Sequence, residues 1–211
     1  MTPEERADEE ELRAALRAAG IRDDDFGLFA ARDIPEAGIR APRFDFEAAA
    51  PVLVYWLPRV KTALVKERIV RSLTGERAAT PLALEPLVAE FRRADDDGLK
   101  WAIGNALATL ADDSIADKLV ELAQDRRHGS SREMLMDALA RTKDERALDA
   151  LVELVDDDDI AGHAISALRR LGPKSSLPYL ERARPSLERQ ATDGETPLAR
   201  RQASAALARL S

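Results

Sequence analysis

The sequence predicts an all-α fold, an α-solenoid of antiparallel helix pairs, and three observations support this. Ala, Leu, Arg and Glu dominate the composition, a mixture that favours helices. Residues 99–125 can be laid over residues 131–157 without a gap, and similar segments return along the chain. Because one helical pair cannot bury its own apolar face, a recurring pair indicates that neighbours stack into a continuous core.

The amino-acid composition argues against several classes of function. The 211-residue chain has no cysteine, which excludes disulfides, thiolate metal sites and cysteine nucleophiles. Its net charge of −7 is uneven: residues 1–50 hold 13 acidic and 7 basic side chains, and the remainder holds 26 and 25. A nucleic-acid partner usually requires a clustered basic surface, which is not evident here. No apolar run approaches the roughly 18 residues of a membrane span. We expect a cytoplasmic protein without a membrane or nucleic-acid partner.

Residues 1–50 are predicted to be an acidic helix followed by an irregular connector that packs on the array. Thr2 and Glu5 have capping-box spacing, Pro3 suits the first helical position, and Gly20 suits the end of a helix over 3–19. A short helix is also predicted near residues 24–32. The phenylalanines expected to pin the connector to the body are Phe26, Phe29, Phe44 and Phe46.

Residues 51–211 are predicted to be a repeat array of about four and a half helix pairs. A short apolar helix that starts at residue 51 stands at the beginning of this range. A small residue followed by leucine recurs in the first helix of each pair, as expected where two helices pack closely. These positions are Ser72-Leu73, Ala106-Leu107, Ala138-Leu139, Ala167-Leu168 and Ala206-Leu207. The first helices, called A helices, are predicted at about 62–74, 98–110, 130–141, 159–171 and 196–210. The second, or B helices, are predicted at about 81–94, 114–126, 145–156 and 176–190.

Capping residues support these limits. Thr80-Pro81 and Thr196-Pro197 each read as an N-cap followed by proline at the first helical position. Ser130 with Glu133 has capping-box spacing, and Asp113 stands just before an apolar periodic run. The aspartates at 95–97 and 156–159 lack the spacing of a calcium loop and are expected to cap helices.

The segments VKERIVRSL, LKWAIGNAL, SREMLMDAL and LARRQASAALARL share one pattern of apolar, basic and small residues. With it, residues 51–211 resemble HEAT-repeat proteins of the short bacterial type, the PBS-lyase HEAT-like repeats. The resemblance implies an α-solenoid and a protein-binding scaffold or adaptor, and it leaves other roles open. Similar repeats occur in phycobilin lyases or chaperones, and in alkylpurine DNA glycosylases, which use a basic concave face with aromatics.

The B helices carry a column of acidic residues. In HEAT arrays these helices usually line the concave side, so an acidic stripe there would bind a basic segment of another protein. The alternative is a charged face that only keeps the array soluble. One column holds Glu85, Asp117 and Asp149, and one turn later stand Glu121 and Glu153.

Trp101 is an unusual residue because its column otherwise holds Glu67, Glu133 and Gly162, residues typical of an exposed face. An exposed tryptophan with Asn105 one turn away is a candidate interface anchor. The alternative is that Trp101 packs under the N-terminal segment or between repeats.

A basic turn suggests a second hypothesis. Arg126, Arg127, His128 and Arg132 flank a predicted helix N-terminus, where arginines and backbone N–H groups could hold an anion. The alternative is a cationic tail that closes the preceding helix. Lys66, Lys100 and Arg132 also form a column near the aspartates between repeats, which predicts a structural ion-pair ladder.

Catalytic and metal-binding patterns are not recognisable. The two histidines, His128 and His163, are 35 residues apart, and no Gly-x-Ser-x-Gly elbow or glycine-rich phosphate loop is present. The expectation is therefore a protein without catalytic residues, metal or cofactor.

Overall fold

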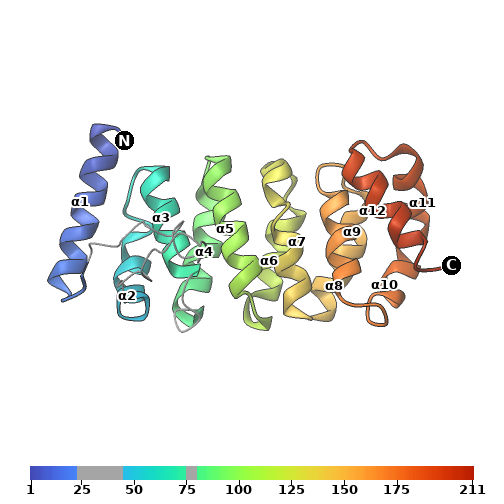
Figure 1. Cartoon of the computed structure of the whole chain (residues 1–211), viewed down its shortest axis with the longest axis horizontal. Coiled ribbons are helices and arrows are strands. Elements are labelled where there is room, and N and C mark those ends of the chain that lie inside the picture. Colours follow the sequence, from blue (N-terminus) through green and yellow to red (C-terminus); the bar gives the residue numbers. More distant parts are fainter. Residues whose placement is uncertain (23–44, 75–79) are drawn as a thin grey trace, which may run out of the picture. The chain divides into compact units, whose positions relative to one another are not determined.

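The computed structural model describes residues 1–22, 45–74 and 80–211. The chain forms two compact units, Met1–Ala106 and Leu107–Ser211. Every regular element among the described residues is helical (Figure 1), which confirms the predicted all-α class. The predicted helix at 24–32, and with it Phe26, Phe29 and Phe44, lies outside the described residues.

The first unit begins with the predicted acidic helix. Thr2 and Glu5 form the expected capping box of α1, Pro3 occupies its first turn, and Gly20 follows its end with φ of 77°. Leu12 and Leu16 are fully buried, because α1 packs against the next two helices. The helices of this unit are α1 (Pro3–Ala18), α2 (Phe46–Trp56), α3 (Ala63–Thr74), α4 (Thr80–Arg93) and the start of α5 (Asp97–Leu110).

Helix α2 begins earlier than predicted. The Asp45 carboxylate accepts the Ala48 N–H across 3.0 Å, so the helix starts at Phe46, five residues ahead of the expected Pro51. The last residues of the predicted connector are therefore the first turn of a helix that contacts α1, α3 and α4.

The second unit stacks helices in two rows. Helices α7, α9 and α12 contact one another in sequence, as do α6, α8 and α10 in the adjoining row (Figure 1). The small-residue and leucine column lies where the rows meet: Ala138, Leu139, Ala167 and Leu168 are fully buried. The α-helices are α6 (Ala116–Gln124), α7 (Leu135–Thr142), α8 (Glu145–Glu153), α9 (Ala161–Arg170), α10 (Leu177–Arg182), α11 (Arg184–Asp193) and α12 (Pro197–Leu207).

Two predicted helices of this unit are shorter or broken. The helix expected over 130–141 starts at Leu135, after a 3-10 segment at Arg126–Arg132 that is kinked at Gly129. The capping box predicted for Ser130 and Glu133 does not form, because the Glu133 N–H donates to the backbone carbonyl of Ser130. The helix expected over 176–190 is split into α10 and α11, and Pro185 stands at the start of the second piece.

Other caps are close to expectation. Thr196 caps α12 by accepting the Ala199 N–H across 3.0 Å, with Pro197 in the first turn as predicted. The cap before α6 is Asp112, which accepts the Ser114 N–H across 2.9 Å, and is not Asp113 as the sequence suggested.

Candidate functional site

The predicted acidic column of the second unit lies on α6 and α8, and arginines of the following repeat stand beside it. Asp117 is 74% exposed and pairs with Arg146. Asp149 is 50% exposed and accepts a hydrogen bond from Arg182 across 2.6 Å. The same relationship recurs with Arg189 and Asp156 one helix further along. Each of these aspartates thus forms an ion pair with an arginine that lies about one repeat later in the chain.

The second acidic column is one helical turn further along. Glu153 accepts a hydrogen bond from the Gln124 amide across 3.2 Å and also contributes to raising the pKa of Arg182, after the larger effects of its hydrogen bond and charge interaction with Asp149. Glu121 is exposed on α6. We name Asp117, Glu121, Asp149 and Glu153 the acidic face. Glu85, the remaining residue of the predicted stripe, is exposed on α4 in the first unit.

Trp101 is exposed on α5, as the column comparison predicts. Its exposed fraction is 47%, which is high for the largest apolar side chain. Asn105 donates its amide N–H to the Trp101 backbone carbonyl across 3.2 Å. In the same unit Tyr55 is 56% exposed, and the Arg59 guanidinium lies 3.6 Å over its ring. Tyr55 is not among the residues predicted from the sequence, although an arginine four residues after a tyrosine, here in the turn that follows α2, is a usable signal for such stacking.

The basic turn is neutralised by carboxylates. Arg127 makes a two-pronged contact to Asp125 at 2.9 and 2.6 Å, which holds the pKa of Asp125 well below its ordinary value. Arg126 lies 3.4 Å from Asp157, and the His128 ring is nearly buried 3.6 Å from Asp125. An anion at this turn would therefore have to compete with carboxylates that already hold the arginines.

Arg132, the fourth residue of the basic turn, is fully buried. Its guanidinium donates to the carbonyls of Gly129 and Ala123 at 2.8 and 3.0 Å and to Asp157 at 2.9 Å. A weaker contact at 3.3 Å reaches Asp159. The side chain thus ties the turn to the segment before the next repeat, a structural role.

Lys66, like Arg132 a member of the predicted basic column, also forms an ion pair, and it lies in the first unit. Lys66 pairs with Glu90, whose side chain is buried, and Arg93 donates to the same carboxylate across 2.6 Å. Lys100 is also nearly buried. Lys66 and Arg132 therefore act as internal ties between helices, and these members of the column are not exposed ligands.

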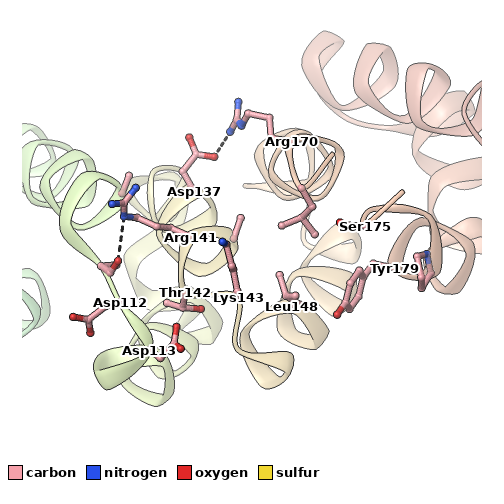
Figure 2. Close-up of a pocket in the computed structure, with 15 residues that line it drawn as sticks. Asp112, Asp113, Asp137, Arg141, Thr142, Lys143, Leu148, Arg170, Ser175 and Tyr179 are labelled. Carbon is pink, nitrogen blue, oxygen red and sulfur yellow. Dashed lines mark hydrogen bonds and ion pairs between the residues drawn. The ribbon is translucent and has the colours of Figure 1, made fainter. Parts of the chain in front are cut away.

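A groove that the sequence analysis did not predict lies where the A helices of the second unit turn into B helices (Figure 2). Its volume is about 1110 Å³. Most of its wall comes from residues 111–113, residues 141–143, and Leu171, Ser175, Pro178 and Tyr179 of the following turn. Lys143 stands in it with φ of 57°, and Gly172 holds the matching turn of the next repeat with φ of 102°. A lysine aligned with a turn glycine is the signal that could have marked this site.

The described residues bear on two further questions, whether metal ligands cluster and whether a helix could span a membrane. Across residues 1–22, 45–74 and 80–211, no three side chains of the histidine or carboxylate type cluster as metal ligands would. Within those same ranges, no helix has the length and apolar character needed to cross a membrane.

Comparison with known proteins identifies the repeats. A family profile described as HEAT repeats matches residues 84–169, which include the segments with the clearest internal repetition. No curated protein and no solved structure matches the chain. The stacked helix pairs agree with the matched profile, and residues 84–169 are HEAT repeats.

Proposed function

We propose that this chain is a non-catalytic protein-interaction scaffold whose acidic face binds a basic segment of another protein. HEAT repeats generally serve as protein-interaction scaffolds. The observation that carries the finer proposal is the exposure of the acidic face on two adjacent helices of one compact unit.

The ion pairs on this face do not prevent binding. Asp117 and Asp149 are at least half exposed, as are their partners Arg146 and Arg182. Exposed ion pairs contribute little to stability, because water screens them and ordering two long side chains costs entropy. A lysine or arginine of a partner can therefore replace the internal arginine at small cost, and charge complementarity would favour the encounter.

Trp101 supplies a second contact of the kind that anchors interfaces. Large aromatic side chains dominate binding energy because they bury much area with little loss of rotamer freedom. Because Trp101 belongs to the first unit, its contribution is proposed independently of the acidic face.

The test is affinity capture with the full chain, comparing wild type with three variants. Glu121→Lys reverses a charge on the acidic face, and Trp101→Ala removes the aromatic anchor. Asp193→Lys is the matched control: it makes the same charge change on an exposed position at the end of α11, where a cation is favourable. The expected result is one stoichiometric protein partner that is lost with the first variant, weakened with the second and kept with the control.

Equal recovery from all four proteins would overturn the proposal. Two further measurements address the other roles of similar repeats. Salt-dependent binding to double-stranded DNA would favour a nucleic-acid function, and ligand-dependent visible absorbance after incubation with a bilin would favour a lyase or chaperone role.

A further inference from the structure

The groove of the second unit combines an apolar floor with unpaired charge. Leu148, Leu171 and Pro178 line it together with three alanines, and Tyr179 closes one side. Its volume of about 1110 Å³ is slightly larger than that of most ligand sites, and three successive turns of the repeat array contribute to it. A site of this size and extent suits a segment of chain better than a single small molecule.

The charged groups are ordered along the groove. In Figure 2, Asp112, Asp113 and the Arg141 guanidinium lie toward one end, Lys143 in the middle, and Tyr179 at the other end. Asp137 and Arg170 pair with each other on the rim and so neutralise one another. The groove therefore presents one end with two carboxylates and the Arg141 guanidinium, a basic centre formed by Lys143, and an aromatic end.

The two basic side chains Arg141 and Lys143 take part in no ion pair among the described residues. Arg141 donates its Nε–H to the Ala111 carbonyl across 3.1 Å. Within residues 1–22, 45–74 and 80–211, no carboxylate is placed to pair with Arg141 or Lys143. This differs from the acidic face and the basic turn, where the structure supplies opposite charges to the arginines.

Lys143 occupies a backbone conformation that suits glycine. It is the only residue other than glycine with positive φ in the described ranges, and the equivalent turn of the next repeat uses Gly172. A side chain with a Cβ is strained in the left-handed region. The turn therefore carries a lysine where the backbone favours glycine, and this lysine contributes the basic centre of the groove.

We propose that this groove binds an extended segment of a partner protein in which a basic, an acidic and an apolar or aromatic residue follow one another. The basic residue faces Asp112 and Asp113, the acidic residue faces Lys143, and the apolar residue packs against Leu148 and Tyr179. The inference goes beyond the acidic face of α6 and α8 and does not depend on it.

The experiment selects peptides from a random twelve-residue display library on the wild-type chain, after depletion on the Arg141→Glu/Lys143→Glu double variant. The expected result is an enriched set in which an acidic residue is flanked by a basic residue on one side and an apolar residue on the other. Absence of enrichment over the depleted background overturns the proposal.

Affinities of the enriched peptides are then measured by fluorescence polarisation. Lys143→Gly removes the ammonium while relieving the backbone, so the fold is retained, and at least a tenfold loss of affinity is expected. Lys143→Gln, which keeps the Cβ, should weaken binding similarly. Lys174→Ala is the matched control, because this exposed lysine lies in the next turn outside the groove, and it should bind as wild type. Unchanged affinity in both Lys143 variants overturns the proposal.

Charge reversal tests the contact directly. Exchanging the peptide's acidic residue for lysine should abolish binding to wild type and restore it to Lys143→Glu. Inorganic phosphate alone is added as a competitor. If it displaces the peptide from the wild-type chain at millimolar concentration, the occupant is a small anion and the proposal is wrong. A chain that loses its partner with Glu121→Lys but not with Lys143→Gly separates the acidic face from the groove.

Discussion

Arg132 and Asp157 form an ion pair in the interior of the second unit. The Arg132 guanidinium is fully buried, and its Nη1 donates to Asp157 Oδ2 across 2.9 Å. The arginine precedes α7 and the aspartate precedes α9, so the pair joins the starts of two successive A helices. A buried pair is strongly destabilising to break, because the remaining charge loses its partner without regaining water.

Replacing Arg132 with methionine is therefore expected to destabilise the chain by about 3–5 kcal/mol. The methionine fills similar space but leaves the buried Asp157 with only the exposed Arg126, 3.4 Å away, as a cationic partner. Chemical denaturation followed by circular dichroism measures the change. Arg127→Met, which removes an exposed arginine from the same turn, serves as control and should change the unfolding midpoint little. A small effect of Arg132→Met would show that water reaches the pair.

Acid should destabilise the chain through Asp8 and Asp157. Burial works against ionisation of both, but hydrogen bonds from Thr62 and Lys61 outweigh it at Asp8, and those of Arg132 do so at Asp157. Both pKa values are therefore lower in the folded state than in the unfolded chain. The two ionised aspartates therefore contribute to the free energy of unfolding at any pH above their unfolded-state pKa of about 4. This contribution is lost as the pH falls through their folded-state pKa values.

The corresponding measurement is the free energy of unfolding of wild type and Asp8→Asn between about pH 6 and pH 2. Because the asparagine does not titrate, the variant should lose less stability over the acidic part of this range. Parallel curves for the two proteins would contradict the assignment of Asp8.

Asp8 also fastens α1 to the array. Its carboxylate accepts the N–H groups of Lys61 and Thr62 at 3.0 and 2.7 Å and the Thr62 hydroxyl at 2.8 Å, at the start of α3. Asp8→Ala is expected to cost about 2 kcal/mol, since a charged cap and its hydrogen bonds are lost together. Limited proteolysis should then release α1 sooner than in wild type. Glu10→Ala, on the exposed side of the same helix, is the control.

Gly162 marks a close approach of α9 and α12. A Cβ at this position would lie 2.8 Å from Leu198 Cγ and 3.0 Å from the Ala199 backbone nitrogen. Gly162→Ala should therefore destabilise by about 1–3 kcal/mol through overpacking, although alanine favours helices. Thermal unfolding of wild type and Gly162→Ala measures whether the substitution lowers or raises the stability.

A second variant separates steric conflict from other causes. If Leu198 is the obstacle, Gly162→Ala/Leu198→Ala should lose less stability than the sum of the single variants. Strict additivity would assign the conflict to the backbone of Ala199, which cannot move away as a side chain does.

The sequence by itself determined the helical class, the repeat and the buried columns. Composition and the recurring small residue followed by leucine are local and periodic, and burial follows from them because each helix hides one face. Ala138 and Leu139 are accordingly buried as predicted, and the Thr2 cap forms from residues three apart. The same column comparison left Trp101 either exposed or packed against a neighbouring segment, and the structure shows it 47% exposed.

Only the tertiary structure decided which charges are available to a partner. Arg132 lies in a basic turn but is buried against Asp157, 25 residues away. Asp149 belongs to the acidic column but is joined to Arg182, 33 residues away. Lys143, which nothing in the column analysis singled out, stands in an unforeseen groove. Ion pairing and cavities depend on distances between segments remote in the chain, and a periodic pattern records which face a residue occupies but not which charge of the next repeat it meets.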